Sequence, residues 1–463
     1  MESGPPAYLP VSSGYLEDAS GMRGRAERLF RPSTHAEAAA ILAQASRLRV
    51  PVTFAGAGTG VAGGRVPDGG WIVSTELLQQ LNVEPGRARV GAGVLLQDLQ
   101  VTAKISGQFY APDPTEQTAS LGGTVATNAS GSRSFLYGST RDHLLSLTVA
   151  FLDGSVRTIG RGEALNFPYT PLPKPLVRKH STGYHLPVDG GLMELLCGSD
   201  GTLCAVLEAE VALLPFPAAL LSGVVFFPTE ERALNAVDAW RPIPRLRMLE
   251  FMDSDSLQLL AAAYPQIPAA AGAALLIEQI GDGEMDLVED QWLDRMSASG
   301  ALDDSWFGSG AADRERFRVF RHRLAELVNE RVRLQGFQKI STDLAVPLER
   351  NHEMMRWYRS VLSARFSGRS VVFGHIGDAN VHVNILPRSA SDAEMGRDFV
   401  LESARHAVSL GGTVSAEHGL GKRKAHLLAV EFTPDQIEAM RAVKRHFDPH
   451  WLLGRGTLFP VEL

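Results

Sequence analysis

The sequence has little cysteine: its 463 residues include only Cys197 and Cys204. An iron–sulfur cluster takes four cysteine ligands, so the sequence excludes one, and any electrons that the protein handles must leave through another carrier. In a reducing compartment, two cysteines are expected to be small buried side chains rather than the halves of a disulfide.

Long apolar runs and an excess of basic residues are lacking too. The best apolar run, Ala269 to Ile277, falls far short of the roughly 20 residues that cross a bilayer. With 45 basic against 52 acidic residues, the net charge of −7 argues against a general nucleic-acid surface. The first residues show neither the basic start nor the apolar core of a secretory signal. We therefore expect a cytoplasmic protein, at most peripheral to a membrane.

What the chain does have is length and an apolar content of 44%, which together are too much for one compact core. The sequence pattern changes at Pro215 to Pro217: beyond these residues, helical and strand patterns alternate as in an α+β domain. We expect one domain over residues 1–216 and a second over residues 217–425. A C-terminal helical segment over residues 426–463 is expected to return to the first domain.

Capping and turn signals predict individual elements. Thr34 and Glu37 form a capping box before an alanine-rich helix, and Thr433 and Gln436 form another near the C-terminus. Further helices are expected over 313–334 and, capped by residues 391–394, up to the glycines at 411–412. Strands are expected over 51–55 and 71–74, over the apolar run before a turn at 153–154, and just before Glu417.

Three glycine-rich turns, at 56–64, 120–131 and 198–202, stand next to predicted strands. In the first, Gly58, Gly60 and Gly63 fit the dinucleotide fingerprint, but the strand at 71 follows too soon for the helix that this fingerprint requires. Successive bare N–H groups in a turn can bind an anion without a helix. A plain turn, and for the second tract a linker, are the alternatives. Three such turns are what a large, phosphate-bearing cofactor would require.

Two later segments carry residues suited to chemistry. Residues 371–386 are typical of a hairpin in which His375 and His382 face each other across the base of the turn. Glu417 and His418 enter a glycine loop further on. Two histidines and Glu417 would suit Zn²⁺, Mn²⁺ or Fe²⁺, which leaves His418 as a general base. The alternative to a metal site is that both histidines are hydrogen-bonded residues of the core. Metal-dependent hydrolysis by the same two histidines and Glu417 is another possible function, but it would leave the glycine turns unexplained.

Six motifs, in order, resemble those of one flavoprotein family. They are GAGTGVAGG from Gly56, PDPTEQTASLGGTVATNASG from Pro112, YGSTRDHLLSLTVAFLDG from Tyr137, GSDGTL from Gly198, GHIGDANVHVN from Gly374 and AEHGLGKRK from Ala416. Nearly from end to end, the chain is similar to the FAD-dependent D-2-hydroxyacid dehydrogenases of the vanillyl-alcohol oxidase superfamily. That family includes D-lactate, glycolate and D-2-hydroxyglutarate dehydrogenases.

The resemblance implies a two-part α+β FAD-binding domain of the vanillyl-alcohol oxidase type and an α+β cap domain with an antiparallel sheet. It implies metal ligands at His375, His382 and Glu417, a substrate contact at Asn384 and the base at His418. The FAD contacts that it implies are Gly56, Gly58, Thr59, Gly60, Gly63, Gly64, Pro112, Asp113, Ser120, Gly122, Gly123, Thr127, Asn128, Gly131, Gly198, Asp200, Gly201 and Val206.

The implied reaction oxidises a small D-2-hydroxy acid by hydride transfer to flavin N5, with metal-assisted substrate binding. Arg321, with Arg318 second, is the candidate for the substrate carboxylate, because an arginine fork matches a carboxylate. The electrons would pass to an external quinone, cytochrome or electron-transfer flavoprotein. Three alternatives stay open. The protein could be a homodimer, it could be a subunit of a larger complex that is inactive alone, or it could be an alcohol or sugar oxidase on the same scaffold.

Departures from the family's pattern refine these expectations. Ser341 stands where relatives that act on hydroxyglutarate have a lysine, and Lys339 lies nearby, which favours a monocarboxylate. The residues Gly454 to Thr457 replace the usual Asn-Pro-Gly-Lys, so a flavin contact from that motif is lost. We identify no histidine or cysteine where superfamily members attach flavin covalently, so FAD is expected to be dissociable.

Overall fold

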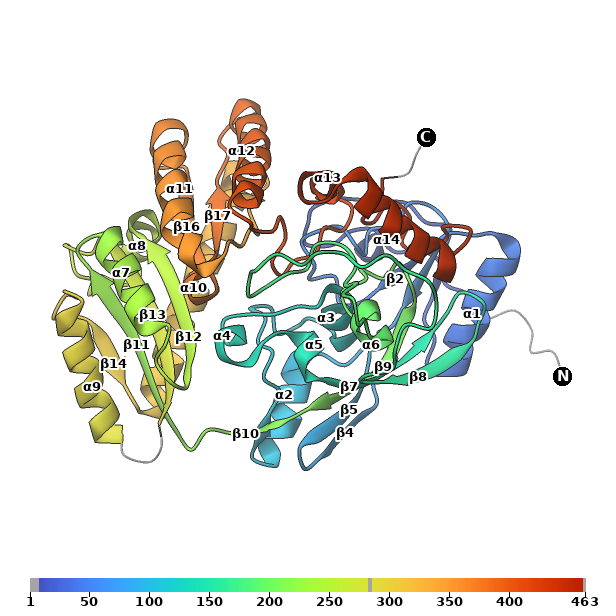
Figure 1. Cartoon of the computed structure of the whole chain (residues 1–463), viewed down its shortest axis with the longest axis horizontal. Helices are drawn as coiled ribbons and strands as arrows, with labels where there is room; N and C mark the ends of the chain where they lie inside the picture. Colours follow the sequence, from blue (N-terminus) through green and yellow to red (C-terminus); the bar gives the residue numbers. More distant parts are fainter. Residues whose placement is uncertain (1–7, 282–284, 461–463) are drawn as a thin grey trace.

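The computed structural model describes residues 8–281 and 285–460, which form two lobes side by side (Figure 1). The first lobe holds the elements up to β10 (Leu214–Pro215), and the second holds those from β11 (Ala219–Phe227) to α12 (Ala390–Ser409). An extended stretch between β10 and β11 joins the lobes. The last helices, α13 (Leu428–Glu431) and α14 (Pro434–Phe447), lie on the first lobe.

The first lobe is built on a parallel sheet of order β1-β3-β2 and an antiparallel sheet of order β4-β5-β9-β7-β8, while β6 pairs with β10. Its strands are β1 (Arg28–Phe30), β2 (Val52–Ala55), β3 (Trp71–Ser74), β4 (Leu81–Glu84), β5 (Arg87–Gly91), β6 (Gln108–Phe109), β7 (Leu144–Ala150), β8 (Val156–Gly160) and β9 (Ala205–Ala212). Its α-helices are α1 (His35–Leu48), α2 (Leu96–Ile105), α3 (Leu121–Thr127), α4 (Ser134–Tyr137), α5 (Thr140–His143) and α6 (Leu192–Leu196).

The second lobe is a seven-stranded antiparallel sheet of order β14-β11-β13-β12-β16-β17-β15. The strands that follow β11 are β12 (Leu246–Asp253), β13 (Ala273–Gly281), β14 (Trp306–Gly308), β15 (Ile340–Ser341), β16 (Ser370–His375) and β17 (Asn380–Ile385). The helices before α12 are α7 (Glu230–Trp240), α8 (Ser254–Ala261), α9 (Met285–Ala298), α10 (Ala311–Gln335) and α11 (Asn351–Arg365).

Helices cover both faces of this second sheet because its strands are apolar on both sides. In β11, Phe227 belongs to the core cluster that includes α7 and α9, whereas its neighbour Phe226 belongs to the cluster that includes α8 and α10. The expected α+β fold, with an antiparallel sheet in the second part, is confirmed.

Local signals predicted many elements correctly. The Thr34 side chain accepts a hydrogen bond from the N–H of Glu37 at 3.1 Å and begins α1. The capping box of Thr433 and Gln436 begins α14. The strand predicted at residues 71–74 is β3, and the turn at 153–154 joins β7 to β8. Cys197 and Cys204 are both buried and free, as expected.

Three local predictions were wrong. Helix α12 is capped by Ser389, whose hydroxyl accepts from the N–H of Asp392 at 3.1 Å, so the capping motif begins two residues earlier than expected. Residues 120–131 contain the short helix α3, since Leu121 and Val125 are one turn apart and both buried. The chain before Glu417 is not a strand, because only Thr413 makes an isolated bridge, to Ala345.

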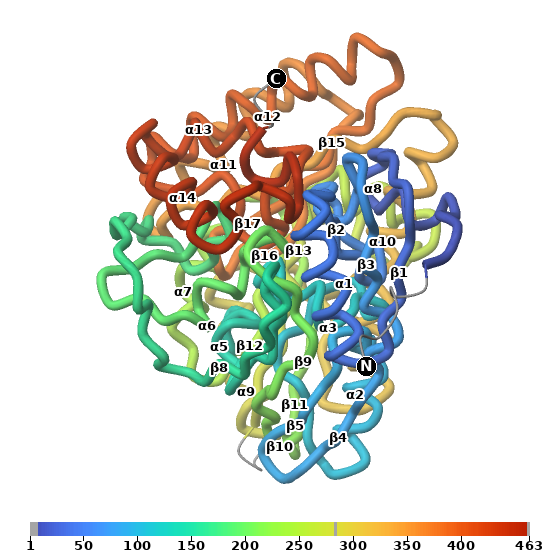
Figure 2. Tube along the Cα trace, turned by 90° about the vertical axis from the view of Figure 1, so that its right-hand side faces the viewer, coloured from blue at the N-terminus to red at the C-terminus, as the bar shows by residue number. Residues whose placement is uncertain are grey.

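The C-terminal segment returns to the edge of the parallel sheet. The N–H of Val52 donates to the carbonyl of Leu452 at 2.7 Å, and the N–H of Gly454 donates back to Val52 at 2.9 Å. Figure 2 shows this C-terminal region, in red, against the blue first strands. The open edge of β2 is therefore covered by residues from the far end of the chain.

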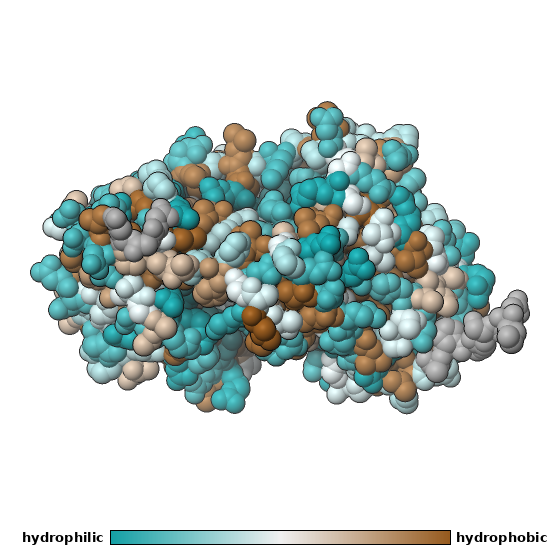
Figure 3. All heavy atoms as spheres, turned by 90° about the horizontal axis from the view of Figure 1, so that it is seen from below, coloured by the Kyte–Doolittle hydropathy of each residue, from teal (hydrophilic) through white to brown (hydrophobic). Residues whose placement is uncertain are grey.

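The surface seen in Figure 3 is mostly hydrophilic, with apolar residues in scattered groups. Among the described residues, no helix is both long and apolar enough to span a bilayer.

Candidate active site

A cavity of about 360 Å³ lies where the three glycine-rich turns meet. Thirteen of the predicted FAD contacts line it: Gly56, Gly58, Thr59, Gly60, Gly64, Ser120, Gly122, Gly123, Thr127, Gly131, Asp200, Gly201 and Val206. Glu417 and His418 line the same cavity. The residues expected to hold the cofactor and two of those expected to do the chemistry therefore share one space.

Five predicted contacts lie outside the cavity lining: Gly63, Pro112, Asp113, Asn128 and Gly198. Two of them have contacts elsewhere. Asp113 pairs with Arg133 at 3.1 Å. Asn128 ends α3 in the left-handed region, and its Oδ1 accepts from the N–H of Arg141 at 2.9 Å. Neighbours such as Pro114 and Ala119 form the cavity wall instead.

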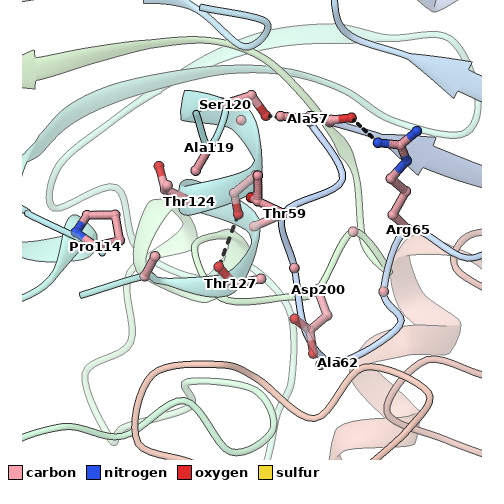
Figure 4. A pocket seen from close by; sticks show the side chains of 18 of the residues that line it. Ala57, Thr59, Ala62, Arg65, Pro114, Ala119, Ser120, Thr124, Thr127 and Asp200 are labelled. Atoms are coloured by element: carbon pink, nitrogen blue, oxygen red, sulfur yellow. Dashed lines mark hydrogen bonds between the residues drawn. The ribbon is translucent and has the colours of Figure 1, made fainter. Parts of the chain in front are cut away.

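The loop of residues 56–64 fits a phosphate-bearing cofactor. In the described part of the chain, no backbone N–H from Gly58 to Gly64 donates to another protein group. A Cβ at Gly60 would meet no atom within 4 Å, because this residue borders the open cavity. Ser120 Oγ accepts from the N–H of Ala57 at 3.3 Å, which ties the loop to α3 (Figure 4). Undonated N–H groups around an open space are what the pyrophosphate of FAD needs.

The carboxylate of Glu417 lies at the centre of the second half of the site. Its Oε1 is 3.0 Å from His375 Nε2 and 3.1 Å from His382 Nε2. Its Oε2 accepts from Ser130 Oγ and from Lys179 Nζ, each at 3.0 Å. Burial disfavours the charged carboxylate, but the cations His375 and Lys179 hold the pKa of Glu417 well below its usual range.

The hairpin register differs from the expectation that its histidines face each other. His375 pairs with Asn380 and His382 pairs with Phe373, yet the two imidazoles remain neighbours with ring centroids 5.4 Å apart. Both point to Glu417, so the three predicted metal ligands do converge. A carboxylate oxygen between two imidazole nitrogens suits a divalent ion such as Zn²⁺, Mn²⁺ or Fe²⁺.

A buried chain of charges extends from His375 to Arg321. His375 Nδ1 is 2.6 Å from Glu250 Oε1, and Glu250 Oε2 accepts from Arg321 Nε at 2.9 Å and from Nη2 at 2.8 Å. Although burial opposes it, Glu250 and Glu417 raise the pKa of His375 to about 9. Burial also opposes ionisation of Glu250, but His375 and Arg321 lower its pKa. Glu250 thus fixes the orientation of the His375 ring.

Arg321 reaches the cavity rim through its remaining edge. Its Nη1 is 3.4 Å from the hydroxyl of Thr115, a residue that lines the cavity. Arg318, the second candidate, is half-exposed and pairs with Glu315 on the same helix at 2.7 Å. Asn384 is buried beside the site, and its Nδ2 donates to the carbonyl of His382 at 3.2 Å.

His418 stacks on His382, with ring centroids 5.1 Å apart, and its Nδ1 lies 3.6 Å from Asp343 Oδ2. Burial lowers the pKa of His418 to about 4, and Asp343 offsets only part of that effect, so the imidazole is neutral at physiological pH. Asp343, His382, Glu417 and His418 each offer a ligand atom, and these atoms lie within 4.8 Å of one another. His418 and Glu417 therefore face the same space, with His418 Nε2 3.7 Å from Glu417 Oε1.

Sequence reasoning missed Ser130, Lys179, Glu250 and Asp343. Glu250 lies in β12, a strand whose residues are all buried. A charged residue within an otherwise apolar stretch is a signal that could have identified it from the sequence. Asp343 stands two residues after Ser341, the position where relatives that act on hydroxyglutarate have a lysine. Lys179 stands in a long loop that has no motif of its own, and nothing in the sequence marks it.

Gly374 makes room for the imidazole of His382. Its φ is +131°, and a Cβ there would lie 2.9 Å from His382 Cδ2. Gly374→Ala is therefore expected to displace the ring and to weaken Mn²⁺ binding about 10-fold, as measured by titration calorimetry. Gly368→Ala is the control, because Gly368 also has a positive φ but no atom within 4 Å of an added Cβ. Equal Mn²⁺ binding by the two variants would contradict the steric argument.

Two family models match the chain. The FAD binding domain matches residues 26–160, and the C-terminal domain of FAD linked oxidases matches residues 217–458.

Curated relatives align over nearly the whole chain. A D-lactate dehydrogenase of Archaeoglobus fulgidus is 31% identical, over 93% of this chain and 90% of that protein. The glycolate oxidase subunit GlcD of Bacillus subtilis is 30% identical, over 99% of this chain and 95% of its own length. A D-lactate dehydrogenase of Anaerostipes hadrus is 29% identical, over 97% and 93%.

Among solved structures, an alkyldihydroxyacetonephosphate synthase superposes with a TM-score of 0.66 over 95% of this chain and 77% of that chain. At 15% identity, this likeness concerns the fold alone. Together with the family matches, these relatives establish that the chain is an oxidoreductase with an FAD-binding domain and that it belongs to the FAD-linked oxidase family.

Proposed function

We propose that the protein oxidises a small D-2-hydroxy acid, of the size of D-lactate or glycolate, to the 2-oxo acid. The observation that carries this proposal is that Glu417 and His418 line the same cavity as the glycine turns of the FAD-binding domain. The names of the relatives, D-lactate dehydrogenase and glycolate oxidase subunit, support the same substrate class.

Bound FAD would supply a two-electron hydride acceptor, and His375, His382 and Glu417 would hold a divalent ion that supplies Lewis-acid polarisation of the hydroxyl. His418 accepts the hydroxyl proton. Asp343 Oδ2, 3.6 Å from Nδ1, favours a proton on that nitrogen, which leaves Nε2, 3.7 Å from Glu417 Oε1, to accept the hydroxyl proton. The Cα hydrogen leaves as hydride, so the acid loses two electrons and two protons overall. An external acceptor then removes the electrons from the protein.

The substrate carboxylate is assigned to Arg321. Glu250 occupies two of its nitrogens, which leaves the Nη1 edge near Thr115 for the substrate. We propose Asn384 as a further substrate contact beside His382. Ser341 replaces the lysine that relatives acting on hydroxyglutarate would use, which favours a monocarboxylate.

Anaerobic reduction of the flavin tests this function. D-lactate or glycolate is expected to bleach the visible flavin absorbance of the purified protein, whereas L-lactate leaves it unchanged. Removal of divalent ions with a chelator is expected to stop the bleaching, and added Mn²⁺ or Zn²⁺ restores it. Bleaching by simple alcohols or sugars, unaffected by chelation, would refute the assignment.

The name glycolate oxidase subunit, carried by relatives 30% and 31% identical, favours a second candidate: a flavin-binding subunit of a larger complex. Turnover by the isolated chain with an artificial dye acceptor separates the two. A chain that reduces its flavin but cannot pass the electrons to the dye would be such a subunit.

A further inference from the structure

Lys179 is a buried lysine that reaches the centre of the site from the first lobe. It belongs to a long stretch between β8 and α6 that contains no helix and no strand among its described residues. Only 4% of its side chain is exposed. A buried ammonium is unfavourable unless it is paired, so its partners indicate what it does there.

The Lys179 ammonium has two hydrogen-bond acceptors and one further ion-pair partner. Nζ is 3.0 Å from Glu417 Oε2, 3.1 Å from the carbonyl of Gly131 and 3.5 Å from Asp378 Oδ2. Gly131 lines the cavity, and Asp378 belongs to the turn between the two histidine-bearing strands. Lys179 thus connects the cavity wall, the histidine hairpin and the carboxylate.

The two oxygens of Glu417 have separate partners as a result. Oε2 is held by Lys179 and by Ser130, both from the first lobe, while Oε1 faces His375 and His382 of the second. Rotation of the carboxylate would break two hydrogen bonds on its Oε2 side. Charge-assisted hydrogen bonds of this kind are among the strongest in proteins.

We propose that Lys179 is a positioning residue that, with Ser130, holds Glu417 so that Oε1 faces the two imidazoles and is ready to ligate the divalent ion. This inference rests on the proposed function, because it needs a metal at Glu417. The positioning role and simple charge balance predict opposite changes in Mn²⁺ affinity when Lys179 is replaced by a neutral residue. Removing a nearby positive charge should tighten binding of a cation, whereas removing a hydrogen-bond partner that orients a ligand should weaken it.

The test measures Mn²⁺ binding to the FAD-loaded, substrate-free protein by calorimetry. Lys179→Met, which keeps the length of the side chain, is expected to weaken Mn²⁺ binding about 10–100-fold with FAD content unchanged. Ser130→Ala removes the second bond to Oε2 and is expected to act in the same direction. Arg178→Met is the matched control. Arg178 pairs with Asp378 at 2.9 Å but has no contact with Glu417, so its loss should leave Mn²⁺ affinity unchanged.

Each outcome decides between the alternatives. Weaker binding in Lys179→Met with normal binding in Arg178→Met supports the positioning role. Equal or tighter Mn²⁺ binding in Lys179→Met overturns the positioning role. In that case the proposed function still stands, provided that the wild-type protein binds Mn²⁺. Absence of Mn²⁺ binding in the wild type overturns both. If Lys179→Met fails to fold, Ser130→Ala decides: weaker binding supports the role, and unchanged binding overturns it.

Discussion

Replacing His418 with alanine is expected to slow reduction of the flavin by a D-2-hydroxy acid about 10²–10⁴-fold, the usual contribution of a general base. The neutral imidazole lies in the cavity wall, stacked on His382 and next to Asp343. Alanine leaves no group there to accept the hydroxyl proton. Stopped-flow absorbance under anaerobic conditions measures the rate, and the visible spectrum before mixing reports whether FAD is bound.

His426→Ala is the matched control for this experiment. His426 lies eight residues further along the same segment, is exposed and does not line the cavity. Its removal should leave flavin reduction unchanged. Undiminished reduction in His418→Ala, with FAD bound, would show that another group takes the proton.

Replacing Glu417 with glutamine is expected to lower Mn²⁺ affinity by at least about 100-fold. Both edges of the carboxylate accept hydrogen bonds, one from the imidazoles and the other from Lys179 and Ser130. An amide offers only one accepting edge, so its NH₂ must face either the imidazoles or the ammonium. The loss of negative charge also leaves Lys179 underpaired, which should lower the free energy of unfolding by about 3 kcal/mol.

Denaturant unfolding without added metal and Mn²⁺ calorimetry measure these two effects separately. Glu431→Gln is the control, because Glu431 is another carboxylate of this region that accepts from Val414 and lies 2.8 Å from His180, but it does not line the cavity. It should lose stability and keep Mn²⁺ affinity. Normal Mn²⁺ binding by Glu417→Gln would refute Glu417 as a ligand.

The parts of this site that follow from local sequence were predictable. A glycine turn exposes its N–H groups wherever it occurs, so residues 56–64 could be proposed as an anion site from the sequence, with a plain turn as the alternative. All of these residues except Gly63 line the cavity. Glu417 and His418 were found because they are adjacent in a glycine loop, and the hairpin histidines because strand and turn signals flank them.

The missed residues depend on contacts between distant parts of the chain. Glu250 is 125 positions from His375, and Lys179 is 238 positions from Glu417. Neither pairing leaves a periodicity or a spacing that can be read locally. The pairing of β12 with β16 inside the second sheet brings Glu250 to His375, whereas packing of the Lys179 loop against the segment after α12 brings Lys179 to Glu417. A single sequence does not determine these contacts at the level of side chains.

The hairpin shows the same limit within one motif. Strand and turn signals fixed which residues form β16 and β17, but the three-residue 3₁₀ turn at 376–378 set the register. That turn pairs His375 with Asn380, so the convergence of the rings comes from side-chain direction rather than from direct pairing.

The contact between Val52 and the segment 452–454 has a consequence for the order of synthesis. The ribosome delivers the first lobe early, and such lobes usually fold as they emerge. Here β2 keeps an unpaired edge until residues 452–454 leave the exit tunnel. Lys444, whose Nζ donates to the carbonyl of Thr202 at 2.7 Å behind the third glycine turn, arrives equally late. A chain stalled or cut before its last helix should therefore leave the edge of β2 unpaired and prone to aggregation, and it should bind FAD more weakly.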